Sequence, residues 1–147
     1  MKADRLITDG ITNDKKIPDG TSKILVIDDE LSIQMLLENF LSRRYQVICK
    51  NNGKEAIEWL EENLPDLIIC DIQMPEMDGY RFLETFRQRG YTKHTPVIML
   101  SCTERSQDRV KCYRLGSQDF LVKPFNPEEL IEVINKNLNP IHYSFTW

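Results

Sequence analysis

The chain contains short apolar runs that are separated by longer segments with a different periodicity. Runs of three or four aliphatic and β-branched residues without a charge are typical of parallel strands that are buried on both faces. On this basis we predict five strands, at Lys23–Ile27, Gln46–Cys49, Leu67–Cys70, Val97–Leu100 and Asp119–Val122.

The segments between these runs have apolar residues at helical spacing, with polar residues on the other side. In the first of them, one buried face is predicted to comprise Ile33, Leu36, Leu37, Phe40 and Leu41. Asn126 followed by Pro127 and two glutamates is a typical helix start. The predicted helices are Leu31–Arg43, Gly53–Asn63, Tyr80–Arg89, Arg105–Leu115 and a last helix from the Asn126 cap to about Asn137. Strands alternating with helices indicate a three-layer α/β domain.

Polar residues stand at or just after the ends of the four strongest apolar runs. They are Asp28 and Asp29, Asp71, Ser101 and Lys123. The carboxyl ends of parallel strands meet at one edge of the sheet, which is where open α/β folds bind ligands. We therefore expect three carboxylates, one hydroxyl and one ammonium to converge there.

Composition limits the class of protein. The 147 residues correspond to one ordinary domain, and 41% hydrophobic with 29% charged residues is typical of a soluble globular chain. A net charge of -4 argues against a general nucleic-acid or membrane binder, and no apolar run approaches the length of a membrane helix. With no secretion signal near Met1, the cytoplasm is the expected location. Four scattered cysteines give no metal-site or disulfide pattern.

The organisation along the chain is predicted to have three parts. Residues 1–21 lack periodicity and hold two Asp-Gly pairs, which indicates a flexible leader. Residues 22–139 form the folded domain. Residues 140–147 form a tail with three aromatic residues, which is expected to pack on the domain or to fray.

The converging residues suggest a specific chemistry. Three carboxylates raise one another's pKa unless a cation compensates them, and Mg²⁺ or Mn²⁺ with oxygen ligands is suited to this. A carboxylate can also act as a nucleophile and form an aspartyl phosphate. Asp71 stands alone at the end of the third strand, so it is the candidate nucleophile. Asp28 and Asp29 form a pair placed to hold a metal ion.

Three motifs resemble the receiver domain of bacterial response regulators. They are Ile24–Glu30 (ILVIDDE), Asp66–Gly79 (DLIICDIQMPEMDG) and Phe120–Phe125 (FLVKPF). The similarity extends over about Ser22–Leu138. It implies a flavodoxin-like fold with five helices around a parallel sheet of strand order 2-1-3-4-5, an order we take from this family.

The resemblance also implies roles for individual residues. Asp71 would accept a phosphoryl group from a phosphohistidine on a sensor histidine kinase or a phosphotransfer protein. Asp28, Asp29, Asp71 and the backbone carbonyl of Gln73 would bind Mg²⁺, and Lys123 and Ser101 would contact the phosphoryl oxygens. Ser101 and Phe120 match the family's switch positions. The peptide bond between Lys123 and Pro124 is cis in the family, and proline makes that isomer accessible.

Three residues depart from or modulate the family pattern. Cys102 follows Ser101 where the family usually has a smaller residue, so access to the phosphoryl group is expected to differ. Gln73 and Thr103 occupy positions that influence how water reaches the acyl phosphate. Because of these three residues, the resemblance does not predict the lifetime of the phosphorylated state.

The favoured function is a stand-alone phosphoacceptor that catalyses only its own phosphorylation and dephosphorylation and switches a partner-binding face. That face would combine the fourth helix, fifth strand and fifth helix, and the output would be either an effector interaction or a relay step. A transcription factor is not expected, since the ten residues after Asn137 cannot hold a helix-turn-helix. Two alternatives are a pseudo-receiver scaffold and an aspartyl-phosphate phosphatase. The phosphatase would need an acid where Gln73 stands.

Overall fold

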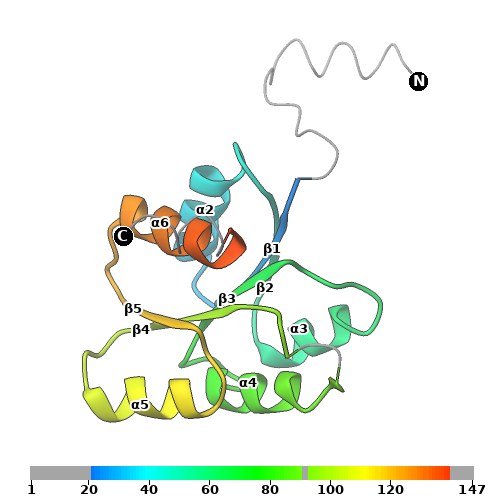
Figure 1. The fold of residues 1–147 in the computed structure, drawn as a ribbon, viewed down its shortest axis with the longest axis vertical. Coiled ribbons are helices and arrows are strands. Elements are labelled where there is room, and N and C mark those ends of the chain that lie inside the picture. Colours follow the sequence, from blue (N-terminus) through cyan, green and yellow to red (C-terminus); the bar gives the residue numbers. More distant parts are fainter. Residues whose placement is uncertain (1–20, 91–92, 140–147) are drawn as a thin grey trace.

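A computed structural model describes residues 21–90 and 93–139, which form a three-layer α/β domain (Figure 1). Its five strands are parallel and lie in the order β2-β1-β3-β4-β5. Their bounds are Lys23–Ile27 (β1), Gln46–Lys50 (β2), Leu67–Asp71 (β3), Val97–Ser101 (β4) and Asp119–Val122 (β5). The predicted fold class and strand order are confirmed.

Five helices cover the two faces of the sheet in the described part of the chain. They are α2 (Leu31–Leu41), α3 (Gly53–Trp59), α4 (Gly79–Arg87), α5 (Ser106–Arg114) and α6 (Pro127–Leu138). Helices α2 and α6 lie on one face, and α3, α4 and α5 lie on the other (Figure 1). The predicted cap of the last helix is present, because the Asn126 side chain accepts hydrogen bonds from the backbone of Glu128 and Glu129.

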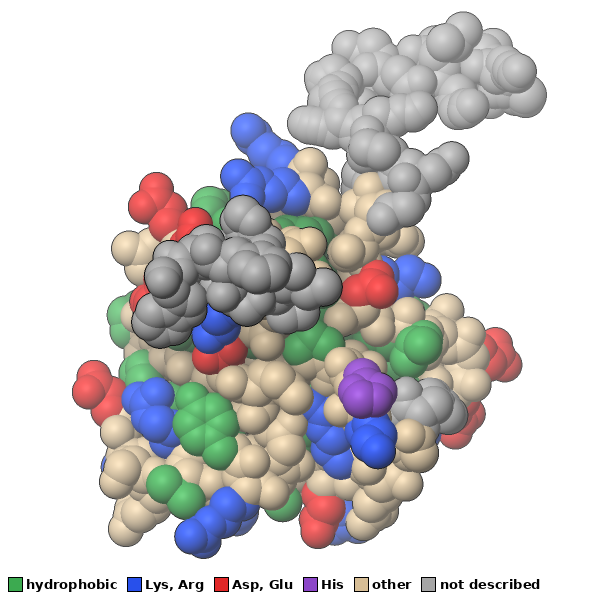
Figure 2. Space-filling view, in the orientation of Figure 1, with side chains coloured by type: hydrophobic (Ala, Val, Ile, Leu, Met, Phe, Trp, Pro, Cys, Tyr) green, Lys and Arg blue, Asp and Glu red, His purple; other side chains and the backbone are tan. Residues whose placement is uncertain are grey.

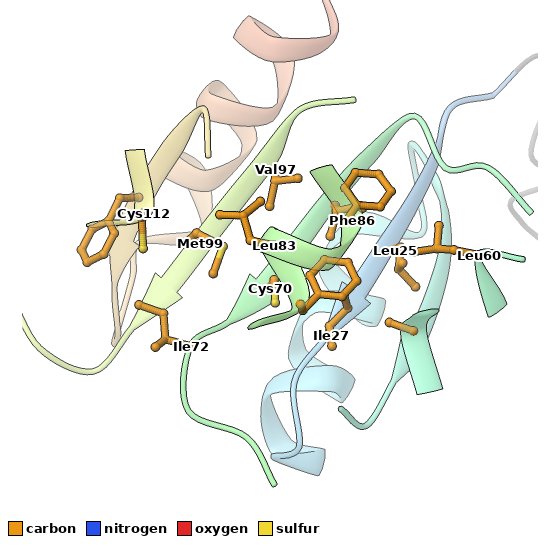
Figure 3. Packing of buried hydrophobic residues seen from close by; sticks show 14 residues of the cluster. Leu25, Ile27, Leu60, Cys70, Ile72, Leu83, Phe86, Val97, Met99 and Cys112 are labelled. Atoms are coloured by element: carbon orange, nitrogen blue, oxygen red, sulfur yellow. The ribbon is translucent and has the colours of Figure 1, made fainter. Parts of the chain in front are cut away.

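Alternate residues of each strand build two separate cores, as the two-residue period of a strand requires. Leu25 and Ile27 of β1 pack with α3 and α4 side chains in one core, which includes Phe82 and Phe86 (Figure 3). Ile24 and Val26 face the other core, under α2 and α6. These four residues of β1 are fully buried. Burial on both faces explains why the strands read as continuous apolar runs.

The structure corrects several predicted boundaries. Helix α2 ends at Leu41 rather than Arg43, and α3 ends at Trp59 rather than Asn63, with turns following each helix. In α2, Leu36 is 43% exposed although it was predicted to face inward. The fully buried positions are Leu37 and Leu41, four residues apart, and Leu36 is rotated by about 100° from Leu37 around the helix axis.

Strands β2, β3 and β4 each extend one residue further at their carboxyl ends than predicted, and β2 ends at Lys50 rather than Cys49. Asp71 and Ser101 are the last residues of β3 and β4, whereas the predicted strands stopped one residue earlier. Both are therefore held by the sheet and buried. The predicted leader, apart from Thr21, and the tail lie outside the described residues. In the described part of the chain, none of the helices combines the length and hydropathy needed to span a bilayer.

Candidate functional site

The carboxyl edge of the sheet carries an acidic cluster of Asp28, Asp29 and Asp71. One carboxylate oxygen from each lies within 4.8 Å of the other two. Asp28 directly follows β1 and is fully buried, and Asp71 ends β3 with 5% exposure, while Asp29 is exposed. The strands β1 and β3 are hydrogen-bonded neighbours, so their ends bring the three acids together as predicted.

Lys123 enters the same cluster from the end of β5. Its Nζ lies 2.9 Å from Asp28 Oδ2 and 3.3 Å from Asp71 Oδ1. It also lies 2.9 Å from Glu30 Oε1. The backbone N–H of Lys123 donates to the carbonyl of Ser101 at 2.7 Å, which anchors the residue at the sheet edge. The peptide bond from Lys123 to Pro124 is cis, as expected.

Burial and mutual charge shift the pKa values of the cluster. Burial and, after it, the charge of Asp28 raise the pKa of Asp71, Lys123 opposes both effects, and the resulting pKa is about 6. Burial also raises the pKa of Asp28, against the hydrogen bond from the Glu30 backbone and the nearby positive charge of Lys123. Burial lowers the pKa of Lys123, but Glu30, Asp28 and Asp71 outweigh this and raise it. The site therefore has more negative charge than its one ammonium balances.

A divalent cation fits this oxygen-rich edge. Asp28 Oδ1 accepts a hydrogen bond from the Glu30 backbone at 2.9 Å. Among the described residues, the fully buried Oδ2 accepts no hydrogen bond, and its close neighbour is the ion-pair partner Lys123, whose Nζ lies 2.9 Å away. An unsatisfied buried carboxylate oxygen beside two further carboxylates is a donor set for a hard ion such as Mg²⁺ or Mn²⁺. Asp28, Asp29 and Asp71 are the residues that would hold it.

The Asp78-Gly79 pair packs the start of α4 directly against the end of β3. The Gly79 backbone N–H donates to the Ile72 carbonyl at 2.7 Å. A Cβ at Gly79 would lie 2.3 Å from the carbonyl oxygen of Asp71, well inside contact distance. Only glycine allows this approach. The Asp78 side chain caps the helix by accepting from the Arg81 backbone at 2.9 Å.

Ser101 is buried beside the cluster and already has hydrogen-bond partners. Its strand β4 lies between the strands of Asp71 and Lys123. Ser101 Oγ accepts a hydrogen bond from the Thr103 backbone N–H at 3.0 Å. The two hydroxyl oxygens, Ser101 Oγ and Thr103 Oγ1, are 3.4 Å apart. Thr103, predicted as a modulator, is thus in direct contact with the predicted switch residue.

Phe120 is 5% exposed and belongs to the core under α3, α4 and α5. The guanidinium of Arg109 lies over its ring, 4.6 Å from the centroid. The structure adds a cation–π contact from α5 that the sequence did not reveal.

A cavity of about 340 Å³ opens beside the cluster. Gln73, Tyr80, Ser101, Thr103 and Asp108 are among the residues that line it. At its edge, the exposed Cys102 donates from its thiol to Gln73 Oε1 at 3.6 Å. Of the predicted modulators, Gln73 and Thr103 therefore line this cavity, and Cys102 contacts Gln73. Metal coordination by the Gln73 carbonyl stays a prediction.

Sequence reasoning missed Glu30, Asp108 and Tyr80, which bond to site residues or to one another beside the site. Glu30 shares the ammonium of Lys123, and its position directly after Asp28-Asp29 was an available signal. Asp108 accepts hydrogen bonds from Thr103 and from Tyr80. An acidic residue in the first turn of a helix is usually explained by its favourable interaction with the helix dipole. The local sequence therefore did not indicate the contacts of Asp108 with Thr103 and Tyr80.

The sequence matches the model of the response regulator receiver domain over residues 24–135. The chain therefore belongs to this family. It is 38% identical over 117 residues to a response regulator of Synechocystis sp. and 39% identical over 109 residues to the alkaline phosphatase synthesis transcriptional regulatory protein of Bacillus subtilis. These matches cover 78% and 74% of this chain but only 50% and 45% of the two relatives.

Solved structures agree with this assignment. A chemotaxis protein of Vibrio cholerae superposes with a TM-score of 0.77 at 32% identity, covering 81% of this chain and all of that one. A response regulator from Chloroflexus aurantiacus gives 0.76 at 33% identity, covering 80% of this chain and 97% of that one. The receiver fold thus accounts for nearly all of the described residues. The curated relatives are about twice as long as the matched region.

Proposed function

We propose that this protein is a phosphoacceptor response regulator in which Asp71 is the phosphorylated residue. The observation that carries the proposal is the position of Asp71, whose Oδ1 lies 3.3 Å from Lys123 Nζ and whose carboxylate joins that of Asp28 and Asp29. A nucleophilic carboxylate beside a fixed cation and a metal-binding pair is what phosphoryl transfer to aspartate requires. The donor would be a sensor histidine kinase or a histidine phosphotransfer protein.

In the proposed reaction, a carboxylate oxygen of Asp71 attacks the phosphorus of a phosphohistidine. A new P–O bond forms while the P–N bond breaks, and the donor's imidazole leaves. When bound, Mg²⁺ would supply positive charge to the transferring phosphoryl oxygens. Lys123 would supply a second positive charge, and Asp71 must be ionised to react, which its pKa of about 6 permits at neutral pH. Ser101 would donate its hydroxyl to a phosphoryl oxygen.

The protein would act on no substrate other than itself and its phosphodonor. We infer that it catalyses only its own phosphorylation and dephosphorylation, and that it works in the cytoplasm. The phosphatase alternative is not favoured, because Gln73, two residues after Asp71, has an amide that cannot act as a general acid. The scaffold alternative is not favoured either, because Asp28, Asp71 and Lys123 are in mutual contact.

The partner-binding surface is proposed to comprise α5, β5 and α6, which are the domain's fourth helix, fifth strand and fifth helix. Val110 and Tyr113 on α5 are 43% and 44% exposed and offer apolar contact area. On the face seen in Figure 2, Lys and Arg side chains are interspersed with Asp and Glu. Phosphorylation would change this surface through Ser101 and Phe120, whose strands pair side by side.

Incubation with Mg²⁺ and acetyl phosphate, followed by intact-protein mass spectrometry, tests the proposal. We expect a gain of one phosphoryl group in the natural protein and none in Asp71→Asn. A matched control is Asp66→Asn, which changes an acid before β3 whose side chain accepts a hydrogen bond from the Lys23 backbone. A gain that persists in Asp71→Asn, or that is absent from the natural protein, would contradict the assignment.

A further inference from the structure

A chain of hydrogen bonds leads from the switch hydroxyl to a tyrosine on a different helix. Thr103 Oγ1 donates to Asp108 Oδ2 at 2.7 Å. Tyr80 OH donates to the other oxygen, Asp108 Oδ1, at 2.9 Å. Thr103 lies in the loop between β4 and α5, Asp108 in the first turn of α5, and Tyr80 in the first turn of α4. We call these three residues the Asp108 latch.

The number of protons in the latch determines the direction of the hydrogen bond at Ser101. A threonine hydroxyl has one proton, and that of Thr103 is directed to the Asp108 carboxylate. In the contact between Ser101 Oγ and Thr103 Oγ1, Ser101 is therefore the donor. At 3.4 Å this bond is weak. The Ser101 proton that would bond to a phosphoryl group is thus directed toward Thr103, and the Thr103 backbone N–H donates to the same oxygen.

Tyr80 is held firmly enough to act as the fixed end of the latch. Lys111 of α5 lies over its ring, with Nζ 4.1 Å from the centroid. Burial raises the pKa of the Tyr80 phenol, and the hydrogen bond to Asp108 raises it further, so Tyr80 remains a donor at neutral pH. Its neighbour Gly79 is bonded to the Ile72 carbonyl and packs on Asp71. The latch therefore ties the segment after the acceptor to the segment after Ser101.

The Asp108 carboxylate has an additional partner that is weaker. Arg105 Nε lies 3.2 Å from Asp108 Oδ2, but the Arg105 side chain is 68% exposed. Hydrogen bonds from Thr103 and Tyr80 lower the pKa of Asp108, so it is an ionised acceptor at neutral pH. Hydrogen bonds to an ionised acceptor are stronger than those between neutral groups. Removal of Tyr80 OH should loosen the latch without removing the exposed pair with Arg105.

We propose that Asp108 is a positioning residue, and that the latch it forms with Tyr80 and Thr103 holds the loop after β4 in its unphosphorylated arrangement. This inference rests on the proposed function, in which Ser101 turns its hydroxyl to the phosphoryl group. For that movement Ser101 must leave Thr103, and Thr103 is held by Asp108. The latch thus opposes activation and sets how much of the protein is in the active arrangement before phosphorylation.

Beryllofluoride titration with Mg²⁺ tests the latch, because this phosphoryl mimic binds at the acceptor without covalent chemistry. The dissociation constant would be measured from amide NMR signals of Ser101, Thr103 and Phe120. Tyr80→Phe keeps the ring and its contact with Lys111 but removes the hydroxyl. One hydrogen bond to a charged group corresponds to a change of about 10- to 150-fold, so we expect the dissociation constant to fall by up to that factor.

A second variant and a matched control separate positioning from stability. Asp108→Asn keeps the shape of the side chain, removes the charged acceptor and should also tighten binding of the mimic. Tyr45→Phe is the matched control. It removes the hydrogen bond that Tyr45 OH donates to Asn135 Oδ1 at 2.8 Å, in the core on the opposite face of the sheet. It should reduce thermal stability and leave the dissociation constant unchanged.

The NMR spectra without the mimic provide a readout that a purely structural role would not change. In Tyr80→Phe, the Ser101 and Phe120 signals should shift along the line toward their mimic-bound positions. If the natural protein binds the mimic but both latch variants bind it equally or more weakly, the latch is wrong and the proposed function stands. If the natural protein does not bind the mimic, the proposed function is wrong, and the latch inference falls with it.

Discussion

Lys123 Nζ lies 2.9 Å from Glu30 Oε1, so the ammonium that is proposed to bind the phosphoryl group is shared with a half-exposed carboxylate. An incoming phosphoryl group must compete with Glu30 for this cation. Glu30→Gln should therefore strengthen beryllofluoride binding by about 2- to 5-fold at low salt, and less at high salt, because exposed charges are screened. Calorimetric titration at two ionic strengths would measure this. Weaker binding in Glu30→Gln would mean that Glu30 assists rather than competes.

Asp71→Asn should stabilise the protein in a pH-dependent way when no divalent cation is present. The folded protein raises the pKa of Asp71 from 3.8 to about 6, so it binds a proton more tightly than the unfolded chain does. Protonation of Asp71 therefore stabilises the folded natural protein. This stabilisation is complete below pH 4 and is lost as the pH rises through 6. At pH 8 the variant should be more stable by up to about 3 kcal/mol.

Urea unfolding in EDTA at several pH values would measure this difference. The stabilisation by Asp71→Asn should be largest at pH 8 and should disappear toward pH 4. A difference that is the same at all pH values would show that charge burial is not its cause. Addition of Mg²⁺ at pH 8 should reduce the difference, since a cation compensates the carboxylates only in the natural protein.

Divalent cations should raise the melting temperature, because they bind the folded state through the acidic cluster. Asp28→Asn should remove most of this effect, because it replaces the fully buried oxygen that has no hydrogen-bond donor. Thermal melts in EDTA, Mg²⁺ and Mn²⁺ would test it. Glu61→Gln changes an exposed acid on the surface and should keep the full metal response. If Asp28→Asn shows the same rise in melting temperature with metal as the natural protein, Asp28 is not a metal ligand.

Gly79→Ala should destabilise the fold severely. The new Cβ would lie 2.3 Å from the Asp71 carbonyl oxygen, and a backbone atom in a central strand cannot move away cheaply. We expect a loss of about 2 kcal/mol or more in the free energy of unfolding. Gly90→Ala is the matched control, because a Cβ there meets nothing within 4 Å. Equal stabilities of the two variants in urea unfolding would contradict the close approach.

Arg109→Gln should loosen Phe120 without unfolding the protein. The substitution removes the guanidinium that lies 4.6 Å from the ring centroid. A cation–π contact at a partly exposed site contributes about 0.5–1 kcal/mol, and the free energy of unfolding should fall by that amount. NMR of the Phe120 ring would report faster exchange between orientations. An unchanged ring signal would mean that packing alone orients Phe120.

Sequence reasoning succeeded for the strands and failed for some helix ends. The strand predictions were accurate because the strands are buried on both faces, so that Ile27 in one core and Val26 in the other must both be apolar. Helix ends depend on weaker local signals. Pro65 suggested that α3 continues to Asn63, but the helix ends at Trp59. Leu36 shows a related limit, since an apolar residue at helical spacing can still be exposed.

By itself, the sequence determined that Asp28, Asp29, Asp71, Ser101 and Lys123 meet at one edge, because parallel strands align their carboxyl ends. The tertiary structure alone decided how these groups are paired. The bonds of Lys123 to Glu30 and of Tyr80 to Asp108 join residues that are 93 and 28 positions apart. Such contacts depend on how helices and loops pack around the sheet, and no local pattern of residues encodes that packing.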